Sequence, residues 1–335
     1  MSSPVRATVR YRLEPPPPPG QPPLTDAVGT VVRNDPEAVV LETRRGTVTI
    51  PRDRIVATRI IPPAGPRRGI AGGDLEPLAL HDLVADGWPA IDTARLGGWL
   101  LRAGRGFTAR ANSVLPVGDP GVPLAEAVDA VEEWYAERHL PANVTLAGPE
   151  GFDPARDPLG RLLLDRGYVA SQPSLFLTTR PATILRRSAE RGRPAPGRHT
   201  VEIGIGGELT DEWLTAYDGY RLGDRDAARA IMTGSPAQRF ATARAGGEVV
   251  GVGRLGMSGT WGGIAAMWVD PAYRRHGIAR RMLGELVTAA TELGATNLHL
   301  QVWADNAPAL RLYESLGFRR HHAYRNLSST PARAL

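Results

Sequence analysis

The chain of 335 residues contains no cysteine and no lysine. Without cysteine it can form no disulfide, no thiolate nucleophile and no cysteine-containing metal site. It also has no apolar run near the ~18 residues that a membrane span needs, and residues 1–25 lack the apolar stretch of a signal peptide. We therefore expect a cytoplasmic protein that does not span a membrane.

All 40 cationic side chains are arginine, and 35 acidic residues leave a formal net charge of +5. Such an arginine bias is typical of a GC-rich genome, and it is equally compatible with a polyanionic ligand. Nucleic-acid binding is the weaker interpretation, because no recognition motif is present and the acidic residues are interspersed with the arginines. Composition alone leaves genomic bias and a polyanionic ligand open.

The first 62 residues predict a small β-domain. Apolar residues alternate over 5–13, and four short β-branched runs follow at 28–32, 39–43, 47–50 and 56–61. Five short strands in this length favour an SH3-like barrel. The proline run 15–19, followed by Pro22 and Pro23, must form an exposed loop, because proline donates no backbone hydrogen bond. Residues 62–74 predict a linker.

Two segments with both helices and strands, 75–180 and 200–330, follow in the same order of elements. In the first we expect helices at 78–85, 124–139 and 159–166 and strands at 98–102, 108–115, 144–146 and 174–179. In the second we expect helices at 209–220, 277–293 and 307–316 and strands at 241–245, 249–255, 263–269 and 298–303. The arginine-rich residues 181–199 predict a linker. The repeated order indicates an internal duplication.

The strongest chemical signal is the turn that ends at Gly277. A buried strand ends there and a helix begins, and the first N–H groups of a helix have no internal partner and attract anions. Gly277 lacks a side chain, so a phosphate can approach the backbone. The residues of this anion site are Arg274, Arg275, His276, Gly277, Ile278, Ala279 and Arg280. An ordinary basic helix start is the plain alternative.

A second motif follows 29 residues after Gly277, as Asn306-Ala307-Pro308, then Tyr313, then Gly317-Phe318. Together the two motifs resemble the signature of the GCN5-related N-acetyltransferases, which transfer acetyl from acetyl-CoA to amines. The resemblance is close over 200–330 and faint over 75–180. The whole chain is similar to an actinobacterial subgroup with an SH3-like barrel and two tandem acetyltransferase folds, of which some are called N-acetylglutamate synthase.

The resemblance implies a mixed central sheet flanked by helices, twice over, with the first copy degenerate. It also implies acetyl-CoA as cosubstrate, with no metal. The pyrophosphate would lie on the loop of Gly277, and the pantetheine would contact Asn306 and the backbone of Met267, Trp268 and Val269. Tyr313 would be the general acid for the leaving thiolate. Each residue has a plain alternative, since Asn306 is a good helix N-cap and the others suit a core.

The general base is where the sequence departs from this family. Relatives such as the ribosomal-protein acetyltransferases often have a glutamate twelve residues before the tyrosine, where this chain has Gln301. An amide cannot accept the proton that an ammonium must lose. His299 on the same strand face, Asp224 or Asp226, or a water ordered by Gln301 remain as alternatives.

Two further patterns carry less chemistry. His321 and His322 are adjacent, so in a strand they should face opposite ways and make a poor metal site. In the first segment the turn 117–123 has no arginine, and Leu163 stands where the second segment has Tyr313. We therefore expect residues 75–180 to be structural or to lie on the acceptor side.

We expect an enzyme that moves acetyl directly to a primary amine, because no cysteine is available for an acetyl-enzyme intermediate. The acceptor would be a small amino acid, with glutamate suggested by the names within the subgroup. The alternative is a non-catalytic module that senses acetyl-CoA and binds a partner protein. The resemblance leaves a homodimer open.

If the loop binds the pyrophosphate, replacing Gly277 with aspartate should abolish acetyl-CoA binding, because a carboxylate would occupy and repel the phosphate position. Calorimetric titration with acetyl-CoA checks this. Unchanged affinity would remove the loop from the site.

Overall fold

The computed structural model describes residues 6–15, 24–43, 46–61, 75–190, 200–218 and 224–329. The chain divides into two compact units, Met1–Gly69 and Ile70–Leu335. The predicted linker 62–74 and residues 16–23 of the proline loop lie outside the described residues, as do residues 191–199. Within the described ranges, no helix is long and apolar enough to cross a membrane.

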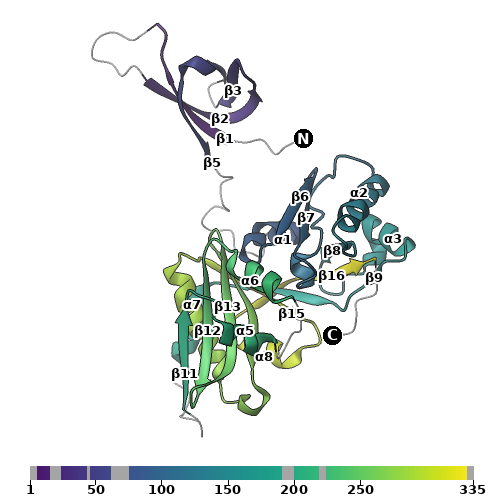
Figure 1. Ribbon diagram of the computed structural model, residues 1–335, viewed down its shortest axis with the longest axis vertical. Coiled ribbons are helices and arrows are strands. Elements are labelled where there is room, and N and C mark those ends of the chain that lie inside the picture. Colours follow the sequence, from purple (N-terminus) through teal and green to yellow (C-terminus); the bar gives the residue numbers. More distant parts are fainter. Residues whose placement is uncertain are drawn as a thin grey trace. The chain divides into compact units, whose positions relative to one another are not determined.

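The first unit is a five-stranded antiparallel sheet with the strand order β4-β3-β2-β1-β5 (Figure 1). Its strands are β1 (Arg6–Arg12), β2 (Leu24–Asn34), β3 (Ala38–Thr43), β4 (Gly46–Pro51) and β5 (Ile55–Ile61). Val9, Leu41 and Ile50 are fully buried in its core. All five predicted strands are present. The edge strands β4 and β5 are not paired over the described residues, so a closed SH3-like barrel remains a prediction.

The second unit is built on one nine-stranded mixed sheet with the order β11-β12-β13-β14-β15-β10-β16-β8, and β9 pairs with β16. Only the β14–β15 pair is parallel; the other neighbours are antiparallel. The strands are β8 (Asn143–Gly148), β9 (Val169–Ala170), β10 (Ser174–Thr179), β11 (Val201–Gly206), β12 (Gln238–Ala245), β13 (Glu248–Ser258), β14 (Trp261–Val269), β15 (Asn297–Trp303) and β16 (Arg319–Ser328). A separate hairpin joins β6 (Asp92–Leu96) to β7 (Trp99–Ala103).

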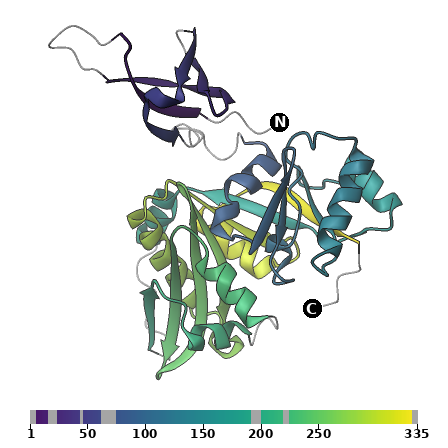
Figure 2. The same cartoon turned by 45° about the horizontal axis from the view of Figure 1, so that its top comes forward.

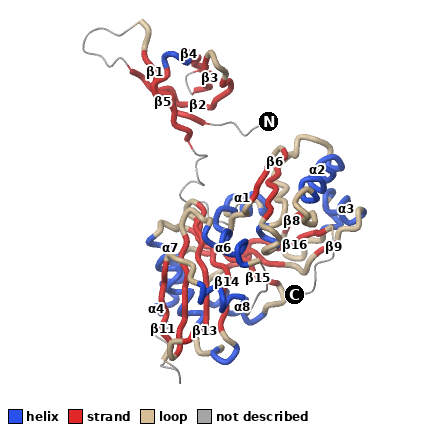
Figure 3. The backbone as a smooth tube through the Cα atoms, viewed as in Figure 1, coloured by secondary structure: helices blue, strands red, loops and turns tan. Residues whose placement is uncertain are grey.

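Helices cover both faces of this sheet (Figures 2 and 3). Alternate residues of a strand point to opposite faces, so Ala241 and Ala243 contribute to the core under α7 while Phe240 contributes to the core under α5. The helices are α1 (Pro77–Leu83), α2 (Leu124–Ala136), α3 (Pro158–Asp165), α4 (Pro181–Glu190), α5 (Asp211–Asp218), α6 (Arg225–Thr233), α7 (Ile278–Glu292) and α8 (Ala307–Leu316). Helix α7 buries one apolar side, on which Met282 and Leu286 are inaccessible to solvent.

Strand β10 joins the two segments that the sequence separates. It belongs to residues 75–180, yet it lies between β15 and β16 of the following segment. Leu175 and Leu177 of β10 share one hydrophobic cluster with Leu286 of α7 and Leu300 of β15. The two segments therefore form one compact unit with a continuous sheet.

The strand predicted at 108–115 is wrong. The segment is a loop with a short 3-10 turn, Ala109–Ala111, and only Val114 and Leu115 make β-bridges. The side chain of Asn112 explains this, because it accepts hydrogen bonds from the N–H of Gly104 and Gly106 and donates to the carbonyls of Phe107 and Thr108. A side chain that satisfies the backbone in this way competes with a strand ladder.

The linker predicted over 181–199 is also wrong in its first half. Residues 181–190 form α4, in which Ile184 is fully buried under the second segment. Its arginines suggested a linker, yet Arg187 donates to the carbonyls of Glu314 and Ser315 on α8. Strands β6, β9 and β11 and helix α6 were not predicted.

Because β10 belongs to the shared core, Leu177→Ala should destabilise both segments together, by about 2–5 kcal/mol. All 7 tryptophans lie in the second unit, on both segments, so tryptophan fluorescence during urea unfolding reports this unit alone. Leu185→Ala on α4, where the side chain is 36% exposed, is the matched control and should change stability by less than about 1 kcal/mol. Two separate transitions, with only one shifted by Leu177→Ala, would contradict a shared core.

Candidate active site

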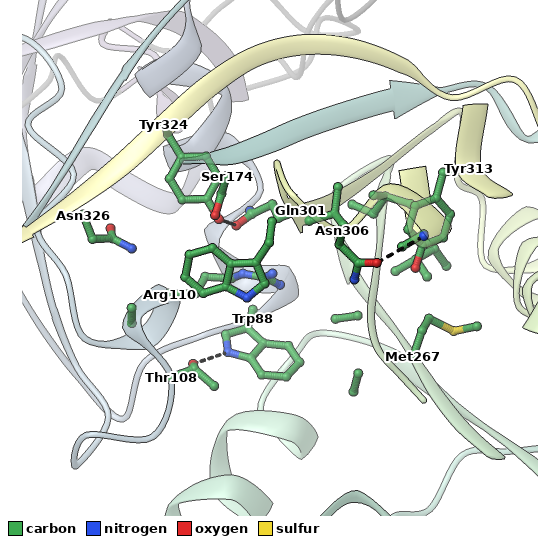
Figure 4. Close-up of a pocket in the computed structure, with 18 of the residues that line it drawn as sticks. Trp88, Thr108, Arg110, Ser174, Met267, Gln301, Asn306, Tyr313, Tyr324 and Asn326 are labelled. Atoms are coloured by element: carbon green, nitrogen blue, oxygen red, sulfur yellow. Dashed lines mark hydrogen bonds between the residues drawn. The ribbon is translucent and has the colours of Figure 1, made fainter. Parts of the chain in front are cut away.

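The candidate site lies where β14 and β15 separate. The two strands pair only from Trp261 to Ile264 on β14, against Asn297 to Leu300 on β15. Beyond this point Ala266 has a positive φ of 53° at an irregularity in the pairing with β13. A cavity of about 210 Å³ lies at the separation (Figure 4). Beyond Ile264, the N–H and C=O groups of β14 that face β15 make no hydrogen bonds to that strand, so a ligand can bind them.

Four of the residues predicted for the site line this cavity together. Met267 comes from β14, Gln301 from β15, and Asn306 and Tyr313 from the start and middle of α8. The loop 274–280 does not line it, and neither do Trp268 or Val269, which are half-buried. The residues predicted for the site therefore form two groups, those that line the cavity and those at the start of α7.

That helix start has the backbone form of an anion site. Gly277 is the N-cap of α7 in the left-handed region, with φ 76°, and provides no side-chain cap to the first turn. Arg275 also has a positive φ of 68°, and Asp270 caps the short turn before it by accepting from the N–H of Ala272. Successive N–H groups in such alternating conformations form concave anion sites. The loop geometry thus fits a bound phosphate group.

The arginines of this loop do not all point at Gly277. Arg274 donates to the carbonyl of Val269 at 2.9 Å, and Arg280 donates to the hydroxyl of Ser315 on α8 at 2.7 Å. Arg281 donates to the carbonyl of Val201 on β11 at 2.9 Å. Arg274 and Arg275 are exposed, and Ile278 is buried. The positive charge near the helix start is therefore held in place by protein oxygens.

Asn306 and Tyr313 combine structural and site positions. The Oδ1 atom of Asn306 caps α8 by accepting from the N–H of Ala309 at 3.2 Å, so its amide nitrogen is what remains for a ligand (Figure 4). Tyr313 is 9% exposed, packs edge-on against Phe318 at 5.8 Å and still lines the cavity. Both residues therefore have the structural roles of the plain interpretation, as cap and core residue, and both also line the cavity.

Gln301 is oriented by a tyrosine that the sequence did not indicate. The hydroxyl of Tyr324 on β16 donates to Oε1 of Gln301 at 2.8 Å, and both side chains line the cavity (Figure 4). Gln301 on β15 is thereby held in place by a side chain of β16.

His299 lies behind the wall of the cavity. Its ring stacks on Phe176 with centroids 5.0 Å apart, and both ring nitrogens are buried with no hydrogen-bond partner among the described residues. Burial, and then the charge of Arg110, lowers its pKa to about 3. A neutral imidazole of such low basicity is a poor proton acceptor at neutral pH.

Three other histidines form a chain beside Phe176. Nδ1 of His321 lies 2.7 Å from Nδ1 of His322, whose Nε2 lies 3.0 Å from Nε2 of His81 on α1. The expectation that His321 and His322 face opposite ways is wrong, because the pairing of β16 with β10 shifts register between Phe176 and Leu177. Within the described residues no group of side chains could hold a metal ion.

The described residues that line the cavity include no aspartate, glutamate or histidine. Asp224, one of the alternatives for the base, instead caps α6 by accepting from the N–H of Asp226 and Ala227. Among the described residues, no carboxylate or imidazole is therefore placed on the cavity to act as a general base.

The first segment supplies a wall that the sequence missed. Trp88, Thr108 and Arg110 line the cavity opposite Tyr313 (Figure 4). The indole N–H of Trp88 donates to the hydroxyl of Thr108 at 3.0 Å. The glycines at 104 and 106 were the available signal for a loop here, but the β-like pattern over 108–115 concealed it.

Comparison with known proteins places this site in a class. A family model described as "Probable histone acetyltransferase Rv0428c C-terminal" matches residues 78–327, and "Rv0428c N-terminal Sm-like domain" matches residues 4–59. The probable histone acetyltransferase Rv0428c of Mycobacterium tuberculosis is 31% identical over 332 residues, which cover 96% of this chain and 94% of that protein. The uncharacterized N-acetyltransferase YobR of Bacillus subtilis is 26% identical over 251 residues, covering 73% and 96%.

A solved GCN5-related N-acetyltransferase from Kribbella flavida has the same fold, with a TM-score of 0.52 at 18% identity over 80% of this chain and 98% of that one. Fold and relatives together define a GCN5-related N-acetyltransferase, an acyltransferase enzyme. The chain belongs to the Rv0428c family of these enzymes, and it contains both the N-terminal and the C-terminal parts. The first unit is described there as Sm-like, where the strand pattern favoured an SH3-like barrel.

The buried histidines make stability depend on pH. His299 has a folded pKa of about 3 against an ordinary value of 6.5, so the unfolded chain binds more protons between these values and stability falls as the pH falls below 6.5. His299→Phe keeps the ring stack on Phe176 and removes this proton uptake. The loss of unfolding free energy between pH 7 and pH 5 should shrink by about 2 kcal/mol, as measured by urea unfolding at both values. An unchanged loss would show that His299 is not held neutral.

Proposed function

We propose that the enzyme transfers the acetyl group of acetyl-CoA directly to the primary amine of a small amino acid, with glutamate as the first acceptor to test. One observation carries the proposal. The cavity at the separation of β14 and β15 brings Met267, Asn306 and Tyr313 together, next to a helix start suited to a pyrophosphate.

The chain's own residues fit acetyl-CoA. The uncapped first turn of α7 would hold the pyrophosphate, supported by the fixed charge of Arg280. The unpaired backbone beyond Ile264 and the amide nitrogen of Asn306 would hold the pantetheine, and a backbone N–H near Met267 would polarise the thioester carbonyl. The remaining residues predicted for the site would lie beside the bound cosubstrate. They are Trp268, Val269, Arg274, Arg275, His276 and Ala279.

The transfer is a single displacement. The amine nitrogen forms a bond to the acetyl carbon, the carbon–sulfur bond breaks, and the thiolate takes a proton from the Tyr313 hydroxyl. The proton released by the amine passes to water, because Gln301 cannot accept it. Tyr313 recovers its proton from solvent. No acetyl-cysteine intermediate can form, because the chain has no cysteine.

We propose that the second unit arose by duplication, with 75–180 and 200–330 as its copies and 1–62 as a separate domain. A parallel bridge between Val114 and Val144 in the first copy corresponds to the parallel pairing of β14 and β15 in the second. Leu163, fully buried, occupies the position of Tyr313. The first copy would serve as the acceptor-side wall.

Tyr313→Phe should lower kcat tenfold or more, because the leaving thiolate loses its proton donor, while the Kd for acetyl-CoA changes less than about threefold. Release of the CoA thiol across a panel of amines measures the first and calorimetry the second. Tyr168→Phe is the matched control, since Tyr168 is a buried tyrosine whose hydroxyl donates to Glu132 away from the cavity. Wild-type turnover in Tyr313→Phe would remove Tyr313 from the mechanism. Binding without thiol release from any amine would favour the acetyl-CoA-sensing alternative.

A further inference from the structure

The loop that forms the acceptor-side wall is strained and fixed. Thr108 has φ 61° and ψ 138°, a backbone conformation that a β-branched residue rarely adopts. The four hydrogen bonds of Asn112 and the bond from Trp88 to Thr108 hold it there. Such strain persists only where the surroundings impose it, and it gathers at functional sites. Here it positions the next two residues, Ala109 and Arg110, on the cavity.

Arg110 belongs to a cluster of three arginines. Its guanidinium lies 5.2 Å from the ring centroid of Trp88, and that of Arg254 lies 5.0 Å from the same ring. Arg102 and Arg110 both line the small void that adjoins the cavity next to Gln301. Of the three, Arg110 is the one that reaches the main cavity.

The two inner members of this cluster are buried, and neither forms an ion pair with an acidic residue in the part of the chain that the structure describes. Arg254 is inaccessible to solvent, and its hydrogen bonds go to the carbonyls of Met232 and Gly87 and the hydroxyl of Ser235. Arg102 is 4% exposed and donates to the carbonyl and the hydroxyl of Ser113. Buried charges in proteins are normally paired, because desolvation is costly.

The cluster remains charged at neutral pH. Burial is the main cause that lowers the pKa of Arg102 to about 10 and that of Arg254 to about 9, and the charge of Arg110 lowers both further. Arg110 therefore lies close enough to both groups for its charge to act on each of them. The acceptor side of the cavity is therefore electropositive, and no acidic residue lies among its described lining residues.

We propose that Arg110 binds an anionic oxygen group of the acceptor, a carboxylate or a phosphate, and so selects amines that carry one. This rests on the proposed acetyl transfer and assigns its substrate class. The planar guanidinium can bind either group with two hydrogen bonds. The same charge opposes an acceptor amine that sits among other cations, as in a lysine-rich peptide.

The test uses the full chain and matched acceptors that differ in one charge. The pairs are glutamate with its α-amide, glutamate with glutamine, and phosphoethanolamine with ethanolamine; a lysine-rich peptide is the fourth arm. Thiol release gives kcat/KM for each. The variants are Arg110→Gln, Arg110→Lys and, as the control with the same charge change on the same loop, Arg105→Gln, whose exposed side chain does not line the cavity.

The wild-type enzyme should prefer the anionic member of at least one pair by tenfold or more. Arg110→Gln should lower kcat/KM for that member by about 10- to 100-fold, mainly through KM, and bring the ratio within the pair close to one. Arg110→Lys should keep part of the preference, and Arg105→Gln all of it. Whether the carboxylate or the phosphate pair responds identifies the group.

An unchanged ratio in Arg110→Gln overturns the proposal, and so does a wild-type preference for the lysine-rich peptide. A rise confined to the KM for acetyl-CoA would assign Arg110 to the cosubstrate and overturn it too. Thermal unfolding of each variant shows that the fold is retained. Absence of thiol release from every amine in the wild type would instead defeat the proposed function itself, so the two failures are distinct.

Discussion

The hydrogen bonds of β10 to β15 on one side and to β16 on the other are the constraint on which the second unit depends. They place a strand from residues 75–180 between two strands of residues 200–330 in one sheet. The loop of Thr108 and Arg110 is thereby held across the cavity from Tyr313. Neither segment encloses this cavity alone, so the site is a product of their shared sheet.

A second constraint follows from where the sheet opens. β14 and β15 pair over four residues and then separate, and the separation provides unpaired backbone for a ligand, as well as the cavity. Hydrogen bonds that a sheet leaves unmade are costly unless water or a ligand takes them. A ligand that takes these hydrogen bonds should therefore stabilise the sheet where β14 and β15 separate.

The sequence predicted the parts of the site that depend on local patterns. Helix rules predict the glycine at the start of α7 and the Asn306 cap of α8, and both are found at these positions. The same rules place Tyr313 on the buried side of α8, where the structure has it. The position of β10 could not be predicted, because strand order depends on long-range pairing. Arg110 was missed for another reason: the side chain of Asn112 converts an apparent strand into a loop. His299 was misjudged because one sequence does not show that Phe176 covers it.

The bond from the Tyr324 hydroxyl to Gln301 also connects strands that are not neighbours in the sheet. It joins β16 to β15 at 2.8 Å, although β10 lies between these two strands. Both side chains line the cavity. This part of the cavity wall is therefore held by three strands of the sheet, whereas the wall of Thr108 and Arg110 is held by a loop.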